Sequence, residues 1–332
     1  MNEAGTALTD PNTNITTKPS TPNHVPPGVE YHRVLAGDKR RIGRGILAIV
    51  LVVGGLQVFT IALTLGIGFV EAQRGYLTPV LGGTDYTPLY HAVSIASVAL
   101  LIPWSMLVQR WLYGVPGRSL HSVVSRFRFD LFGRSLLILG PILVAVLVVY
   151  DYLAPTEKQA MDHTTALWIF VTSLVFVPLQ AAGEEYGFRG LLFRVAASWG
   201  RGPRTALVLG LLVSSAAFAV VHATANPWLN LWYLVFGITT GIIVWRTGGI
   251  EVAVVLHAVF NTVGFTLDVA LRTSFVSAAG REGGAANAYL LVGVFVWIAV
   301  AAVVWIGTRK SGPARTPIVS VGDKNTVDQE RS

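Results

Sequence analysis

Eight long apolar stretches constrain this chain more than any other feature of its sequence. A helix needs about 20 consecutive apolar residues to cross a bilayer, and the third and sixth stretches are short for a full span. The sequence therefore predicts an all-α fold, a polytopic integral membrane bundle of about eight transmembrane helices. The stretches cover approximately residues 46–70, 88–109, 135–151, 165–183, 205–223, 229–245, 250–269 and 288–308.

The composition excludes an ordinary soluble protein. Only 13% of the residues are charged and 52% are hydrophobic, whereas a soluble domain carries about 25% charged residues. The absence of cysteine excludes disulfides, thiolate metal sites and cysteine nucleophiles. The net charge of +7 is typical of the basic cytoplasmic loops of a membrane protein, so no nucleic-acid partner is expected.

The distribution of basic residues predicts the orientation in the membrane. One side of the predicted bundle receives seventeen Lys and Arg residues and the other side four. Basic loops stay in the cytoplasm, so an even number of spans with both termini cytoplasmic is expected. The basic side comprises residues 39–44, 110–134, 194–204, 246 and 309–324.

Polar sequence at both ends of the chain predicts two disordered cytoplasmic tails, residues 1–43 and 309–332. Between them, residues 44–308 form the eight-span membrane domain. The first apolar stretch begins only at Ile46, which excludes a cleavable signal peptide at the extreme N-terminus.

Ionisable residues at membrane depth gather in three places. Glu184, Glu185 and Arg189 follow the fourth stretch, His222 lies in the fifth and His257 in the seventh. Each charge in the bilayer costs at least about 2.5–3.5 kcal/mol, so such residues face one another or a water-filled cavity and mark functional sites. Glu185 and Arg189 are four residues apart and can pair on one helix face. The residues after the fourth stretch either extend its helix or form an amphipathic piece along the interface.

The residue types in this polar pocket limit its chemistry. Phe218 shares a helix face with His222, and Asn261 shares one with His257. A carboxylate with a histidine can activate water as a general base, and a second histidine with an amide can stabilise a tetrahedral oxyanion. These roles suit hydrolysis of a peptide bond. The same Glu, His and His could instead hold a divalent metal.

Helix lengths argue against a shared depth for the two histidines. At 1.5 Å per residue, His222 lies about 27 Å beyond Arg204, whereas His257 lies only about 10 Å beyond Ile250. A later start or a tilt of the fifth helix would reconcile the two. Otherwise His222 is an interface histidine, and Asn261 could serve only as an interhelical hydrogen-bonding residue.

Three motifs carry a resemblance to a known family. They read Glu184-Glu185-Tyr-Gly-Phe-Arg189, Phe218-Ala-Val-Val-His222 and His257-Ala-Val-Phe-Asn261. In this order and on these segments, they resemble the CPBP family, also called the ABI or type II CAAX-endopeptidase family of intramembrane proteases. The resemblance covers about residues 165–270, the expected protease core.

The resemblance implies a catalytic role for four residues. Glu184 resembles the water-activating general base, assisted by His222, and His257 with Asn261 resembles the oxyanion-stabilising pair. The family is described both as metalloproteases and as metal-free glutamate-type enzymes. No cofactor is therefore certain, and the alternative is Zn²⁺ held by Glu184, His222 and His257.

The other motif residues are implied to be structural or orienting: Glu185 and Arg189 as an ion pair, and Phe218. The expected substrate is a membrane-associated peptide or protein in the lipid bilayer of a bacterial plasma membrane, lipidated or not. Because Glu184 lies near the cytoplasmic end of the fourth span, the site is expected to open towards the cytoplasm. The alternative is a non-catalytic scaffold or bacteriocin-immunity-type protein that retains the protease fold.

Overall fold

The computed structural model describes residues 24–153, 161–271 and 290–318. These parts of the chain are helical without β-strands, so the predicted all-α class is confirmed, and eight helical spans are long and apolar enough to cross a membrane. The second span is broken into two helices at Leu100, and the fourth continues through η4 into α6. The principal helices are α1 (Ile42–Ala72), α2 (Pro88–Ala99), α3 (Leu101–Tyr113), α4 (Phe129–Leu153), α5 (His163–Glu185), α6 (Phe193–Ala197), α7 (Pro203–Val221), α8 (Pro227–Thr247), α9 (Glu251–Leu271) and α11 (Leu290–Thr308).

Local sequence signals set the ends of these helices. The Asn226 side chain accepts hydrogen bonds from the backbone amides of Trp228 and Leu229, and Pro227 occupies the first helical position of α8. The same helix ends at Gly248, whose φ of 70° is left-handed and favours glycine. The third and sixth spans are longer than their apolar stretches because polar flanking residues join the helices.

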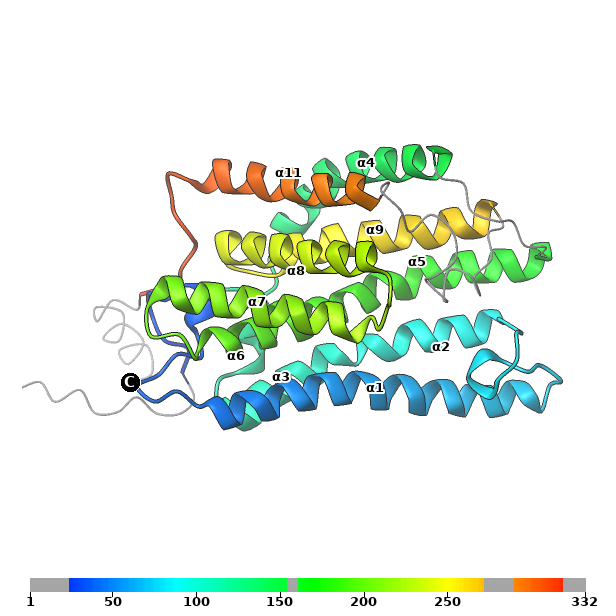
Figure 1. Ribbon diagram of the computed structural model, residues 1–332, viewed down its shortest axis with the longest axis horizontal. Coiled ribbons are helices and arrows are strands. Elements are labelled where there is room, and N and C mark those ends of the chain that lie inside the picture. The colour runs from blue at the N-terminus through cyan, green and yellow to red at the C-terminus, as the bar shows by residue number, and fades with distance from the viewer. Residues whose placement is uncertain (1–23, 154–160, 272–289, 319–332) are drawn as a thin grey trace, which may run out of the picture.

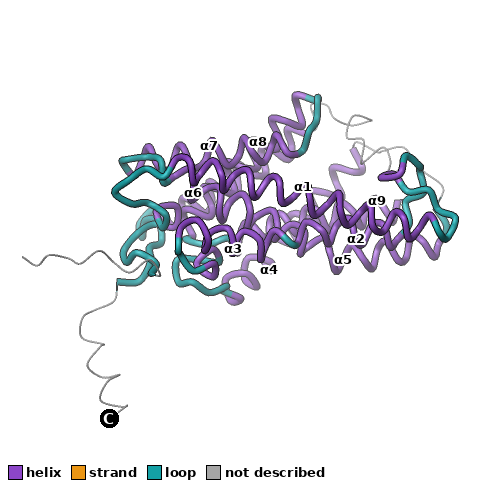
Figure 2. The backbone as a smooth tube through the Cα atoms, turned by 90° about the horizontal axis from the view of Figure 1, so that it is seen from below, coloured by secondary structure: helices purple, strands orange, loops and turns teal. Residues whose placement is uncertain are grey.

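The α7–α8 hairpin is shorter than α1 and the fourth span. α5 packs against α2 and α9, and α8 packs against α7 and α11. Figures 1 and 2 show the hairpin ending partway along the length of α1 and α5. The 19 residues of α7 rise about 28 Å, whereas the 31 residues of α1 rise about 46 Å. His222, at the end of α7, nevertheless lies close to His257, because both rings contact Phe218, at centroid distances of 4.6 and 6.0 Å.

The residues after the fourth stretch extend its helix. A π-helical segment, η4 (Tyr186–Leu192), joins α5 to α6, so the fourth span runs from His163 to Ala197. Residues 183–198 are all buried, which favours the helix extension over an amphipathic piece at the interface. π-Helical turns are rare and occur frequently at functional sites.

Part of each predicted tail is ordered, which corrects the disordered assignment for residues 24–43 and 309–318. Tyr31 and His32 are fully buried, and the two terminal segments pair through Gly28 N to Thr316 O (3.0 Å) and Thr316 N to Val29 O (2.8 Å). Apolar side chains scattered through this polar sequence pack on the end of the bundle. Residues 1–23 and 319–332 lie outside the described residues.

One end of the bundle holds most of the basic residues and is called the basic end. There α1, α7 and α9 begin, and α3, α8 and α11 finish. The loop after α3 is folded against this end rather than being only a solvated basic segment. Arg128 forms an ion pair with the fully buried Glu251 over 2.7 Å, and the Nδ1 atom of His121 hydrogen-bonds with the Tyr186 hydroxyl.

Candidate active site

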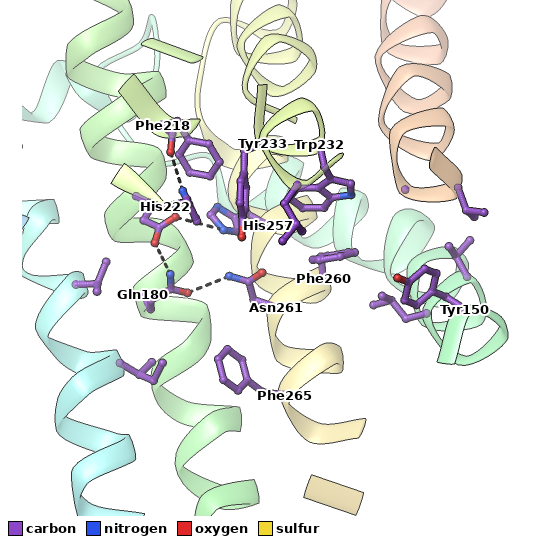
Figure 3. Close-up of a pocket in the computed structure, with 18 residues that line it drawn as sticks. Tyr150, Gln180, Phe218, His222, Trp232, Tyr233, His257, Phe260, Asn261 and Phe265 are labelled. Atoms are coloured by element: carbon purple, nitrogen blue, oxygen red, sulfur yellow. Dashed lines mark hydrogen bonds and ion pairs between the residues drawn. The ribbon is translucent and has the colours of Figure 1, made fainter. Parts of the chain in front are cut away.

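A cavity of about 420 Å³ lies between the helices and is called the chamber. Its polar lining includes Gln180 and Glu184 of α5, His222 at the end of α7, and His257 and Asn261 of α9. Figure 3 shows Gln180, His222, His257 and Asn261 converging from three helices. The four residues with implied catalytic roles therefore meet in one place, together with Gln180, which the sequence did not single out.

Glu184 lies at the last turn of α5, with its carboxylate facing this group. Its Oε1 accepts a hydrogen bond from Nε2 of Gln180 over 2.6 Å, and its Oε2 lies 3.6 Å from Nε2 of His257. The second distance exceeds that of a direct hydrogen bond. The preceding Gly183 allows α5 to pack closely against α2, because a Cβ there would lie 2.3 Å from the carbonyl oxygen of Val98.

His257 is held on its other side by Glu185. The distance from its Nδ1 to Oε1 of Glu185 is 2.8 Å, and the imidazole packs against the rings of Phe218 and Phe236 at centroid distances of 6.0 and 5.0 Å. With Nδ1–H donating to Glu185, the opposite nitrogen points towards Glu184. The two consecutive glutamates thus contact the two nitrogens of one ring.

Arg189 forms an ion pair with Glu185. Its Nη1 lies 3.3 Å from Oε1 of Glu185, so the implied ion pair is present, and its Nε donates to Oγ1 of Thr240 over 3.0 Å. The guanidinium lies over the rings of Phe218 (3.9 Å) and Phe236 (4.9 Å), a cation–π arrangement. Because both charges are buried, removing one would leave the other uncompensated.

His222, directly after the last residue of α7, also lines the chamber. Its Nδ1 lies 2.6 Å from the carbonyl oxygen of Phe218, and its ring stacks on Tyr233 with 3.8 Å between centroids. A carbonyl oxygen only accepts, so Nδ1 carries the proton in this contact and Nε2 of the neutral ring is an acceptor. This tautomer suits a proton-accepting role.

Gln180 connects the carboxylate of Glu184 to the amide of Asn261. Nδ2 of Asn261 donates to Oε1 of Gln180 over 3.2 Å, while Nε2 of Gln180 donates to Glu184. One side chain therefore orients two of the candidate residues. The spacing in the sequence could have identified Gln180, because a polar residue four positions before Glu184 lies on the same helix face.

The alternative zinc site does not fit this geometry. Among the residues that the structure describes, no group of three or more His, Cys, Asp or Glu side chains could hold one metal ion. The predicted metalloprotease class is accordingly not supported.

The expected opening of the site towards the cytoplasm stays a prediction. The chain is tightly packed on the basic-end side of Glu184, where residues 183–198 are all buried. The chamber is lined by the far parts of α4 and α8, through Tyr150 in the last turn of α4 and Leu229 in the first turn of α8, and also by the last turns of α2 and α5. The position of Glu184 along its own helix did not reveal this, because α5 continues as η4 and α6.

Comparison with known proteins supports the resemblance. Residues 164–263 match the family model described as type II CAAX prenyl endopeptidase Rce1-like. An uncharacterized protein of Bacillus subtilis (strain 168), YyaK, is 28% identical over 170 residues, which are 48% of this chain and 55% of that protein. The chain thus matches about half the length of this relative.

No solved structure gives a significant match. The matched region contains the four candidate catalytic residues. One belongs to the motif of α5, one to the motif at the end of α7 and two to the motif of α9. The resemblance predicted from the three motifs is confirmed: residues 164–263 match the model of the Rce1-like, type II CAAX prenyl endopeptidase family.

Proposed function

We propose that this protein is an intramembrane endopeptidase that hydrolyses a peptide bond of a membrane-associated protein or peptide. One observation carries the proposal: Glu184, His222, His257 and Asn261 line a single cavity between transmembrane helices. Placing such polar groups at membrane depth costs free energy, so residues of this kind usually serve a function. The family of residues 164–263 supports the same reaction class.

In this mechanism Glu184 and His222 activate a water molecule. Oε2 of Glu184 faces the gap before His257, and Nε2 of His222 can accept a proton because Nδ1 donates to Phe218. The water loses a proton to this pair as its oxygen attacks the peptide carbonyl carbon. The proton then passes to the leaving amine when the C–N bond breaks, so atoms and charge balance.

His257 and Asn261 stabilise the oxyanion that forms during the attack. The amide of Asn261 has two N–H groups, of which one donates to Gln180, leaving the other for the substrate oxygen. A protonated His257 would donate from Nδ1 to Glu185 and from Nε2 into the chamber. Each well-placed donor contributes about 3–4 kcal/mol to transition-state stabilisation.

The substrate is proposed only as a class. The chamber combines this polar group with apolar walls that include Val146, Leu147 and Phe260, which suit apolar side chains or an anchoring lipid chain. The uncharacterized relative is matched over about half of its length and does not narrow the substrate class further.

The experiment is cleavage of a peptide library by the purified protein in detergent, comparing the wild type with Glu184→Gln. The substitution preserves size and removes the basic carboxylate, so product formation should fall by more than about 100-fold. Asp162→Asn is the matched control, since this acid caps α5 at its far end. Cleavage by Glu184→Gln at the wild-type rate would refute the proposal. The activity of the wild type should persist when a metal chelator is added.

A further inference from the structure

The chamber and the basic residues lie towards opposite ends of the bundle. α4 lines the chamber with its last turns, α8 and α11 with their first turns, and α7 with its final residues, all distant from the basic end, whereas α2 and α5 contribute their last turns, which are nearer that end. Glu184 and His257 form the inner end of the chamber. Entry past them from the basic end is closed by the buried run of residues 183–198.

The turn between α7 and α8 lies beside the chamber at a level where neighbouring helices are still apolar outside. Ala223 and Ala225 in this turn are exposed, and the hairpin ends partway along α1 and α5 (Figure 1). Beyond that level the outer surfaces continue with Phe69, 61% exposed, and Leu167, 59% exposed. Irregular backbone at membrane depth is tolerated only where it is buried or lines a water-filled cavity.

We infer that the chamber is a water-accessible vestibule open to the non-cytoplasmic side, and that its substrate is an apolar juxtamembrane peptide segment presented from that side. The part of this inference that concerns the substrate rests on the proposed function. The part that concerns the direction of access does not depend on that function. The basic end is cytoplasmic because Lys and Arg are retained on that side. A cytoplasmic peptide terminus would then meet the closed end of the bundle.

The apolar character of the segment follows from the walls around the polar residues. Trp232, Phe260 and Phe265 line one side, and Ile95 and Val98 of α2 line another. A peptide with aliphatic or aromatic side chains next to the scissile bond buries them against these rings, at about 25 cal/mol per Å² of apolar surface. A charged segment would have to be desolvated there without a partner.

Single-cysteine labelling tests the direction of access, because the chain contains no cysteine of its own. Ala225→Cys places a thiol in the α7–α8 turn and Arg201→Cys places one in the exposed loop at the basic end. A membrane-impermeant maleimide should modify Ala225→Cys in right-side-out vesicles and Arg201→Cys in inside-out vesicles. Modification of Ala225→Cys only in inside-out vesicles, or in neither preparation while Arg201→Cys reacts, would overturn the inference.

A second arm tests the substrate. Right-side-out vesicles should cleave an added impermeant library of apolar peptides at least about tenfold faster than sealed inside-out vesicles, and faster than an otherwise equal library with Asp and Lys beside the scissile bond. Equal or reversed rates would contradict the inference. If labelling follows the expected pattern but the wild type cleaves nothing from either side, the proposed function fails while the direction of access stands.

Discussion

Nε2 of Gln180 donates a hydrogen bond to Oε1 of Glu184 over 2.6 Å. Both residues belong to α5, one turn apart, and the same Gln180 accepts from Asn261 of α9. The general base and one oxyanion donor of the proposed mechanism are therefore held by a single amide. This connection keeps α5 and α9 in register at the inner end of the chamber.

Replacement of this amide should reduce turnover without unfolding the protein. A hydrogen bond to a charged group contributes about 1.5–3 kcal/mol, so Gln180→Leu should lower kcat about 10- to 100-fold with a smaller change in KM. Steady-state kinetics with a library-derived peptide measure the effect. Leu179→Ala, on the exposed face of the same turn, is the control, and equal losses in both variants would argue against a positioning role.

Glycine at position 183 should be essential for folding or activity. A Cβ at this position would meet the Val98 carbonyl oxygen at 2.3 Å, which forces α5 away from α2 and displaces Glu184. Gly183→Ala should therefore lose most activity and lower the thermal midpoint. Gly264→Ala, with open space around its Cβ, should retain both in the same activity and thermal-unfolding assays. Indistinguishable variants would contradict the close packing.

Lysine should not replace Arg189. Arg189→Lys keeps the charge beside Glu185 but loses the Nε hydrogen bond to Thr240 and the planar stacking on Phe218. We expect a loss of about 2 kcal/mol in stability, measured as a lower thermal midpoint in detergent. The exposed Arg201→Lys is the control, and an unchanged midpoint for Arg189→Lys would contradict the assigned contacts.

Stability should depend on pH through His32, which is fully buried outside the spans. Burial lowers the pKa of this imidazole to about 4, opposed by the nearby Glu30. The unfolded chain binds the proton first as pH falls, so stability is complete above about pH 6.5 and is lost between about pH 6.5 and 4. The maximal loss is on the order of 3 kcal/mol.

Thermal midpoints measured from pH 7 to 4.5 test this dependence. The wild type should lose more stability across this range than His32→Leu, which has no proton to gain. His24→Leu serves as the control because His24 is exposed and should follow the wild type. Parallel curves for wild type and His32→Leu would show that His32 makes no such contribution.

The bundle was predictable because its determinants are local. Each span is a run of apolar residues, and the i,i+4 spacing of Glu185 and Arg189 is enough to foresee their ion pair. The convergence of His222 with His257 was harder, because helix length measured from Arg204 placed them at different depths. In the structure both imidazoles contact Phe218 and line one chamber, an arrangement that depends on how α7 and α9 pack and not on helix length alone.

Other features depend on tertiary packing that no local pattern records. Gln180 has the spacing of a partner for Glu184, but its contact with Asn261 joins residues 81 positions apart. The burial of Tyr31 and His32 arises from packing of a short polar-rich segment against the bundle end. The direction in which the chamber opens depends on which end the buried π-helical extension closes, and that requires the arrangement of all helices.

The most direct test of the central claim follows oxygen from water into product. A library-derived peptide is cleaved in H₂¹⁸O, and the new C-terminal carboxyl group is examined by mass spectrometry for wild type and Glu184→Gln. Hydrolysis activated by Glu184 predicts one ¹⁸O atom per newly formed carboxyl group in the wild-type product and essentially no product from the variant. Labelled product formed equally fast by Glu184→Gln would contradict the account.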